Sequence, residues 1–115
     1  MKMVHVTIFT AKLEESIRFY EDIVGLKIQE DFRTFGGNIV FLAEEKGDTQ
    51  VELIFEPEQA YQGSGISMGF HVEDVEAKRE EVLAKGLAPT PVIAPGPDVK
   101  FFFVNDPNGV TVQFI

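Results

Sequence analysis

The sequence contains no cysteine, which excludes disulfides, thiolate metal ligands and a cysteine nucleophile. It has no run of about 18 apolar residues and no charged-then-apolar leader, so it predicts neither a membrane span nor a signal peptide. Basic residues are few: the chain has 10 Lys and Arg against 19 Asp and Glu, which gives a net charge of −9. Nucleic acid and anionic membrane surfaces are therefore disfavoured as partners, whereas a neutral or cationic small molecule is tolerated. A cytoplasmic location is expected.

Motifs for nucleotide and serine-hydrolase chemistry are also missing. No glycine-rich loop is followed by Lys-Ser or Lys-Thr, and the stretch 63–65 reads as a linker. No serine has His and Asp partners at motif spacing, which disfavours a serine triad. The acidic pairs at 14–15 and 80–81 are typical of solvated helix faces.

Two helices are predicted in a chain whose 115 residues, 44% of them apolar, suit one domain with a hydrophobic core. In the first helix, over residues 13–25, apolar side chains recur at three- and four-residue steps and Gly25 ends the pattern. The second helix spans residues 74–86, with Asp74 as its N-cap and Gly86 at its end.

Short alternating segments predict strands around each helix, so that the order β-α-β-β-β occurs twice. The repeat of about 61 or 62 residues aligns His5 with Ser67, Gly25 with Gly86 and Glu52 with Gln113. We therefore expect one domain over 1–115, with a first module at about 1–56, a linker at 57–65 and a second module at about 66–115. The predicted strands are 4–9, 27–32, 38–43 and 50–55, then 66–72, about 90–93, 100–105 and 110–115. The stretch from Pro89 to Pro97 holds four of the six prolines and predicts an edge strand and a loop.

Alternation divides four of these strands into an apolar face, expected to pack on the helices, and a mixed face. On periodicity alone, the mixed faces could lie in water as in a flat antiparallel sheet, or line a concave pocket. The apolar side chains of Phe9, Ile54 and Ile115 favour the pocket, because they gain little in a water-facing row. The candidate pocket residues are His5, Thr7, Phe9, Gln50, Glu52, Ile54, Ser67, Gly69, His71, Thr111, Gln113 and Ile115.

Several longer stretches resemble one family over essentially the whole chain. They are His5 followed by SIRFYEDIVGLKI, then QVELIF, GISMGFHVEDVEA and FFVNDPNGVTVQF. With them the sequence resembles the vicinal oxygen chelate superfamily, the glyoxalase/bleomycin-resistance/dioxygenase group. The resemblance implies an α+β fold in which two tandem βαβββ modules form a curved, cup-like mixed sheet with the helices outside. It also implies a small-molecule ligand in the cup and a homodimer.

The resemblance places the four metal-ligand positions of the family at His5, Glu52, Ser67 and Gln113. Imidazole and carboxylate are strong ligands for divalent metals, whereas a hydroxyl and a primary amide are weak ones. An amide also cannot act as the general base that glyoxalase-type isomerisation requires. His71 lies about 13 Å along its strand from Ser67 and is expected at the rim of the cup rather than on a metal.

Two functions therefore stay open. The first is a small-molecule binding protein without a complete metal site and without a cofactor. The alternative is a metal-dependent lyase, isomerase or dioxygenase, similar to lactoylglutathione lyase, in which His5 and Glu52 weakly hold zinc, nickel, manganese or iron. The sequence names neither the ligand nor a catalytic residue.

Overall fold

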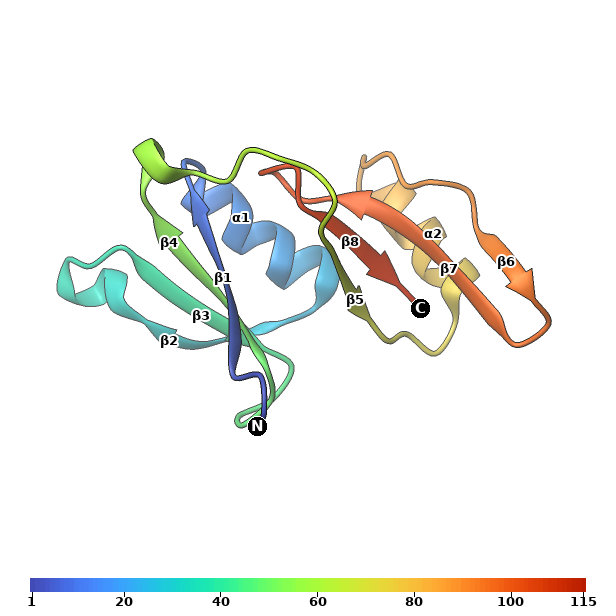
Figure 1. Ribbon diagram of the computed structural model, residues 1–115, viewed down its shortest axis with the longest axis horizontal. Helices are drawn as coiled ribbons and strands as arrows, with labels where there is room; N and C mark the ends of the chain where they lie inside the picture. Colours follow the sequence, from blue (N-terminus) through green and yellow to red (C-terminus); the bar gives the residue numbers. More distant parts are fainter. The chain divides into compact units, whose positions relative to one another are not determined.

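The chain forms two compact units in the computed structural model, which describes residues 1–115. The first unit spans 1–62 and the second 63–115. Each unit contains one four-stranded sheet and one main helix, and the two units repeat the same order of elements (Figure 1). The predicted α+β fold of two repeated βαβββ modules is therefore confirmed.

In the first unit the sheet order is β1-β4-β3-β2, and α1 packs beside β4. The first and last strands, β1 and β4, pair in parallel, whereas the other neighbours are antiparallel. The elements are β1 (His5–Thr10), α1 (Leu13–Phe19), η1 (Tyr20–Val24), β2 (Lys27–Asp31), η2 (Phe32–Phe35), β3 (Ile39–Ala43), β4 (Gln50–Phe55) and η3 (Pro57–Gln59).

The core of the first unit lies between its helix and one face of its sheet. The predicted single helix over 13–25 is instead an α-helix that continues as one π-helical turn, and Gly25 closes it at a φ of 87°. Only glycine adopts this left-handed conformation without strain. The buried apolar residues are Ile8, Leu13, Ile17, Phe19, Tyr20, Ile23, Leu26, Val40, Leu42, Ala43, Val51 and Leu53.

The second unit repeats this arrangement with the sheet order β5-β8-β7-β6. Its first and last strands, β5 and β8, again pair in parallel. Asp74 is the predicted N-cap of the helix, because its side chain accepts a hydrogen bond from the backbone N–H of Ala77 (3.0 Å). The elements are β5 (Ser67–Phe70), α2 (Val75–Ala84), β6 (Ile93–Gly96), β7 (Val99–Asn105) and β8 (Thr111–Phe114).

Further details of the sequence prediction differ from the structure. The edge strand expected near 90–93 runs instead from Ile93 to Gly96. Pro89 and Pro91 flank Thr90 and cannot donate to a ladder, so Thr90 bonds to the backbone of β7 outside any strand. On the faces expected to pack against the helices, Val4 and Phe55 are exposed at the strand ends.

None of the helices has both the length and the apolar character that a membrane crossing requires.

Candidate functional site

A row of side chains crosses the sheet of the first unit at the middle of β4. Thr7 on β1 and Phe41 on β3 are the register partners of Glu52, one on each side. Because side chains alternate along a strand, all three lie on the face opposite Leu53 and Val51, which belong to the core. This row places a carboxylate between a hydroxyl and an aromatic ring.

The carboxylate of Glu52 is the most buried charged group on this face, with a side chain only 12% exposed. The hydroxyl of Thr7 donates a hydrogen bond to Oε1 of Glu52. Nε2 of His5 lies 3.5 Å from the same oxygen, and the His5 side chain is 40% exposed. No Lys or Arg forms an ion pair with Glu52, so its negative charge has only a hydroxyl and an imidazole beside it.

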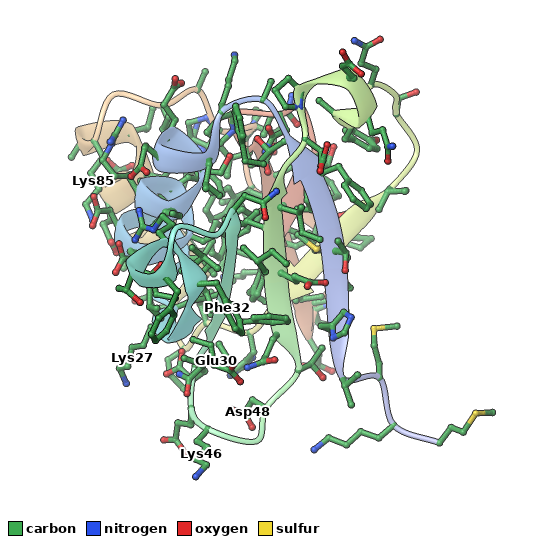
Figure 2. All side chains as sticks on the ribbon, turned by 90° about the vertical axis from the view of Figure 1, so that its left-hand side faces the viewer. Lys27, Glu30, Phe32, Lys46, Asp48 and Lys85 are labelled. Atoms are coloured by element: carbon green, nitrogen blue, oxygen red, sulfur yellow. The ribbon has the colours of Figure 1, made fainter.

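Aromatic rings extend this face toward the edge of the sheet. The ring of His5 meets that of Phe41 edge-on, with 5.8 Å between centroids. The ring of Phe32, in η2, also meets that of Phe41 edge-on, with 6.3 Å between centroids. Figure 2 labels Phe32 beside the strands of the first unit. His5, Phe41 and Phe32, called the aromatic wall below, therefore run from β1 to η2 past Glu52.

The second unit has the same row with different chemistry. Gly69 on β5 and Phe103 on β7 are the register partners of Gln113. The amide of Gln113 makes no side-chain hydrogen bond, and a Cβ added to Gly69 would lie 3.1 Å from its Oε1. Ser67 is exposed at the start of β5. This row carries no charge and no strong metal ligand.

The remaining predicted pocket residues lie at the ends of the same faces. In the first unit, Phe9 is 37% exposed and Ile54 is half-buried. Gln50 is the register partner of His5.

In the second unit, the hydroxyl of Thr111 lies 3.3 Å from Oδ1 of Asn105. His71 follows β5 and is largely exposed, with its Nε2 3.5 Å from Glu73, and Ile115 is exposed beyond β8. Within the first unit, the structure thus brings His5, Thr7 and Glu52 together.

The four family metal positions do not form a strong ligand set. A separation of 3.5 Å between Nε2 of His5 and Oε1 of Glu52 suits two corners of a zinc site, whose bonds are about 2.0–2.2 Å long. The hydroxyl of Ser67 and the amide of Gln113 supply no charge and weak donors. Two of the four positions therefore hold donors too weak for a strong divalent-metal site.

Two cavities, each of about 530 Å³, lie away from Glu52. The first is in the first unit, between the start of α1 and the junction of η2 with β3, and Glu14 and Arg33 line it. The second is in the second unit, where His71, Ile115 and Lys100 line it.

Sequence reasoning missed the aromatic part of the site. Phe41 alternates with the buried Val40 and Leu42 and is half-buried on the mixed face, so the period-two pattern of β3 carried the signal. The same pattern identifies Phe103 in β7, between the buried Phe102 and Val104. No sequence signal identified Phe32. The alternating pattern assigned it to the end of a strand, whereas it begins η2 in the structure.

Comparison with known proteins gives one consistent result. The model of the Glyoxalase/Bleomycin resistance protein/Dioxygenase superfamily matches residues 2–114. The lactoylglutathione lyase of Haemophilus influenzae is 28% identical over 128 residues, which cover 100% of this chain and 92% of that protein.

Solved structures share the fold. The antibiotic-binding protein TnmS3 of Streptomyces sp. CB03234 matches with a TM-score of 0.81 at 19% identity, over 99% of this chain and 93% of that one. The trypanothione-dependent glyoxalase I of Leishmania major matches with a TM-score of 0.78 at 23% identity, over 100% of this chain and 86% of that one.

Proposed function

Because the chain belongs to the Glyoxalase/Bleomycin resistance protein/Dioxygenase superfamily, we propose that it binds a small molecule on the face of the first unit that carries Glu52, without a complete metal site. The proposal depends on the burial of Glu52 and on the groups that contact it. Its carboxylate is 12% exposed, accepts one hydrogen bond from Thr7 and has no basic side chain paired with it. A charge removed from water in this way is expensive unless a partner compensates it.

An organic cation is the ligand class that these contacts favour. The cationic group would pair with Glu52, and its alkyl groups would lie against the ring of Phe41, where a cation–π contact adds attraction. The net charge of −9 also raises the concentration of cations around the protein. The remaining positions on the face, Phe9 and Ile54 among them, would supply apolar contacts.

The test uses benzyltrimethylammonium as the probe and neopentylbenzene as its neutral counterpart of the same shape. In amide NMR spectra, the charged probe should shift the resonances of Thr7, Phe41 and Glu52, and the neutral one should not. Glu52→Gln should weaken binding of the cation about tenfold, the scale of one lost charged contact. Glu58→Gln removes an exposed charge elsewhere and is the matched control. Equal binding of both probes, or equal effects of the two variants, would contradict a cation site at Glu52.

The second candidate is a metal-dependent lyase, isomerase or dioxygenase. The observation that favours it is the separation of 3.5 Å between His5 and Glu52, together with the 28% identity to a lactoylglutathione lyase. Metal content of the purified protein and titration with zinc, nickel, manganese and iron(II) test it, with His5→Ala as the variant. One ion per chain that is lost in His5→Ala would favour the enzyme and lead to assays of hemithioacetal isomerisation and dioxygenase substrates. No bound ion would retire this candidate.

A cytoplasmic homodimer is part of the same proposal. Both sheets have open edges, at β1 and β2 in the first unit and at β5 and β6 in the second. Unpaired strand edges attract other strands, and pairing between chains removes that liability. Light scattering at micromolar concentration should give the mass of two chains, and a monomer would contradict the expectation.

A further inference from the structure

Arg33 connects three segments of the first unit. Its Nη1 donates to both carboxylate oxygens of Glu14 on α1, at 2.9 and 3.1 Å. Its Nη2 and Nε donate to the two oxygens of Asp31 at the end of β2, at 2.7 and 2.9 Å. The hydrogen bond with Asp31 raises the pKa of Arg33 further above its ordinary range, and the hydrogen bond from Arg33 lowers the pKa of Asp31. Arg33 therefore ties the η2 turn both to β2 and to the helix.

The residue before Arg33 is Phe32, the outer member of the aromatic wall. The carbonyl of Phe32 accepts a hydrogen bond from the N–H of Gly37 at 2.8 Å. A Cβ on Gly37 would lie 2.8 Å from that carbonyl oxygen, so only glycine allows this close approach. Arg33 on one side of Phe32 and the hydrogen bond from Gly37 on the other hold the backbone in place. The Phe32 ring contacts Phe41, which in turn contacts His5.

Little else supports η2 on the side that faces α1. None of its residues is buried, and Phe35 is 86% exposed. The cavity of about 530 Å³ lies where the start of α1 faces the junction of η2 with β3, and Glu14, Arg33 and Gly37 line it. Because packed side chains do not fill this space, the ion pair between Arg33 and Glu14 is the polar connection from η2 to the helix.

We propose that Arg33 is a positioning residue for the candidate site: it holds Phe32 against Phe41 and thereby sets the aromatic wall beside His5 and Glu52. The value of this role rests on the proposed function, because the wall matters to a ligand only if one binds there. Arginine suits the role because its planar fork can bond two carboxylates at once, which a lysine cannot do with the same geometry.

The experiment follows the ring protons of His5 by NMR in the ligand-free protein. The protein has two histidines, so His71→Gln assigns the signals. Arg33→Gln should move the His5 signals toward their values in an unstructured peptide, because the ring currents of the wall change. Glu14→Gln should move them in the same direction by less. Arg18→Gln and Glu15→Gln are the matched controls, since both residues are exposed on the same helix and form no ion pair.

Amide exchange gives a second readout of the same turn. The N–H groups of Gly36 and Gly37, which bond within η2, should exchange about two- to fivefold faster in Arg33→Gln, the scale of exposed ion pairs. Arg33→Lys retains the charge, so its His5 signals should lie between those of the wild-type protein and those of Arg33→Gln. Unchanged His5 signals in Arg33→Gln, or shifts in the controls as large as in the variants, would overturn the role of Arg33.

Binding of benzyltrimethylammonium separates this role from the proposed function. Arg33→Gln should weaken binding of this probe about two- to fivefold, the same scale as the exchange effect. If the His5 signals move but the wild-type protein does not bind the probe, the positioning role stands and the cation site falls. If the probe binds equally well to Arg33→Gln and the His5 signals stay in place, the positioning role falls and the cation site stands.

Discussion

The two units of this chain share a backbone plan and differ in the chemistry at one register position. In the first unit, Glu52 lies between Thr7 and Phe41, and in the second, Gln113 lies between Gly69 and Phe103. Both rows contain a phenylalanine. The second row has the amide of Gln113 in place of the carboxylate, and a glycine in place of the threonine that donates the hydrogen bond. The repeat therefore preserves the geometry of a site in both units and its charge in only one.

The fold and the candidate site therefore depend on opposite faces of the same strands. Leu53 and Phe114 occupy equivalent positions on the inner faces, are fully buried and pair with apolar neighbours on both sides. The inner face must remain apolar for either sheet to pack on its helix. The outer face can change without loss of the fold, and a change there alters what the unit can bind.

The largest effect is expected from truncation of the equivalent core residues. Leu53→Ala should lower the free energy of unfolding by about 2–5 kcal/mol, and Phe114→Ala by about 3–5 kcal/mol. The loss should be greater for Phe114, whose ring packs 5.3 Å from Phe102 and 6.5 Å from Phe70. Urea denaturation measures both, and Phe35→Ala, on an exposed side chain, should change stability by less than about 0.5 kcal/mol. A loss at Phe114 no larger than that of the control would break the equivalence of the two cores.

A double-mutant cycle in the second unit tests whether the outer faces of the two sheets are equivalent. Gly69→Thr with Gln113→Glu copies the Thr7–Glu52 pair, because the register is the same. The new side chain meets the flexible end of residue 113, which can move aside. We expect a favourable coupling of about 1 kcal/mol, the scale of one hydrogen bond, from the denaturation of both single variants and the double variant. A coupling near zero would show that equal register does not give equal contacts.

The smallest effect concerns acid. Asp31 in the first unit and Glu76 in the second both have a lowered pKa, because Arg33 and Lys100 donate hydrogen bonds to them. A carboxylate whose pKa is lower in the folded state stabilises the protein above its unfolded pKa, and this contribution is lost as the pH falls through the folded value. Thermal stability should therefore decline below about pH 4.

The variants Asp31→Asn and Glu76→Gln separate the two units in this respect. Each should flatten part of the decline in melting temperature below about pH 4. The first unit should contribute more, because Arg33 donates two side-chain hydrogen bonds to Asp31, whereas Lys100 donates one to Glu76. An unchanged pH profile in both variants would contradict the assignment of these pairs.

Alternation and glycine positions in the sequence predicted much of this fold. The period of two in residues 50–55 placed Glu52 on the mixed face, and the glycines at 25 and 86 marked both helix ends. These signals are local, because each depends on the conformation of a few consecutive residues.

The neighbours of Glu52 were harder to predict. Thr7 meets Glu52 only because β1 pairs in parallel with β4, a contact between segments far apart in the chain. Phe32 was expected in a strand, but Asp31 caps the following turn through the N–H of Arg33, and the chain leaves the sheet there. Such contacts depend on which strands pair and on turn geometry, and neither follows from periodicity.

The parallel pairing of β5 with β8 also sets the order in which the second unit can be built. β8 lies between β5 and β7, yet it is the last strand of the unit to leave the ribosome. Until then β5 has no partner in the sheet, and one edge of β7 is unpaired. Contacts between segments distant in the chain form slowly, and unpaired edges expose nascent chains to aggregation. Completion of the second unit is thus expected to follow that of the first, which can close its sheet while the rest of the chain is still being made.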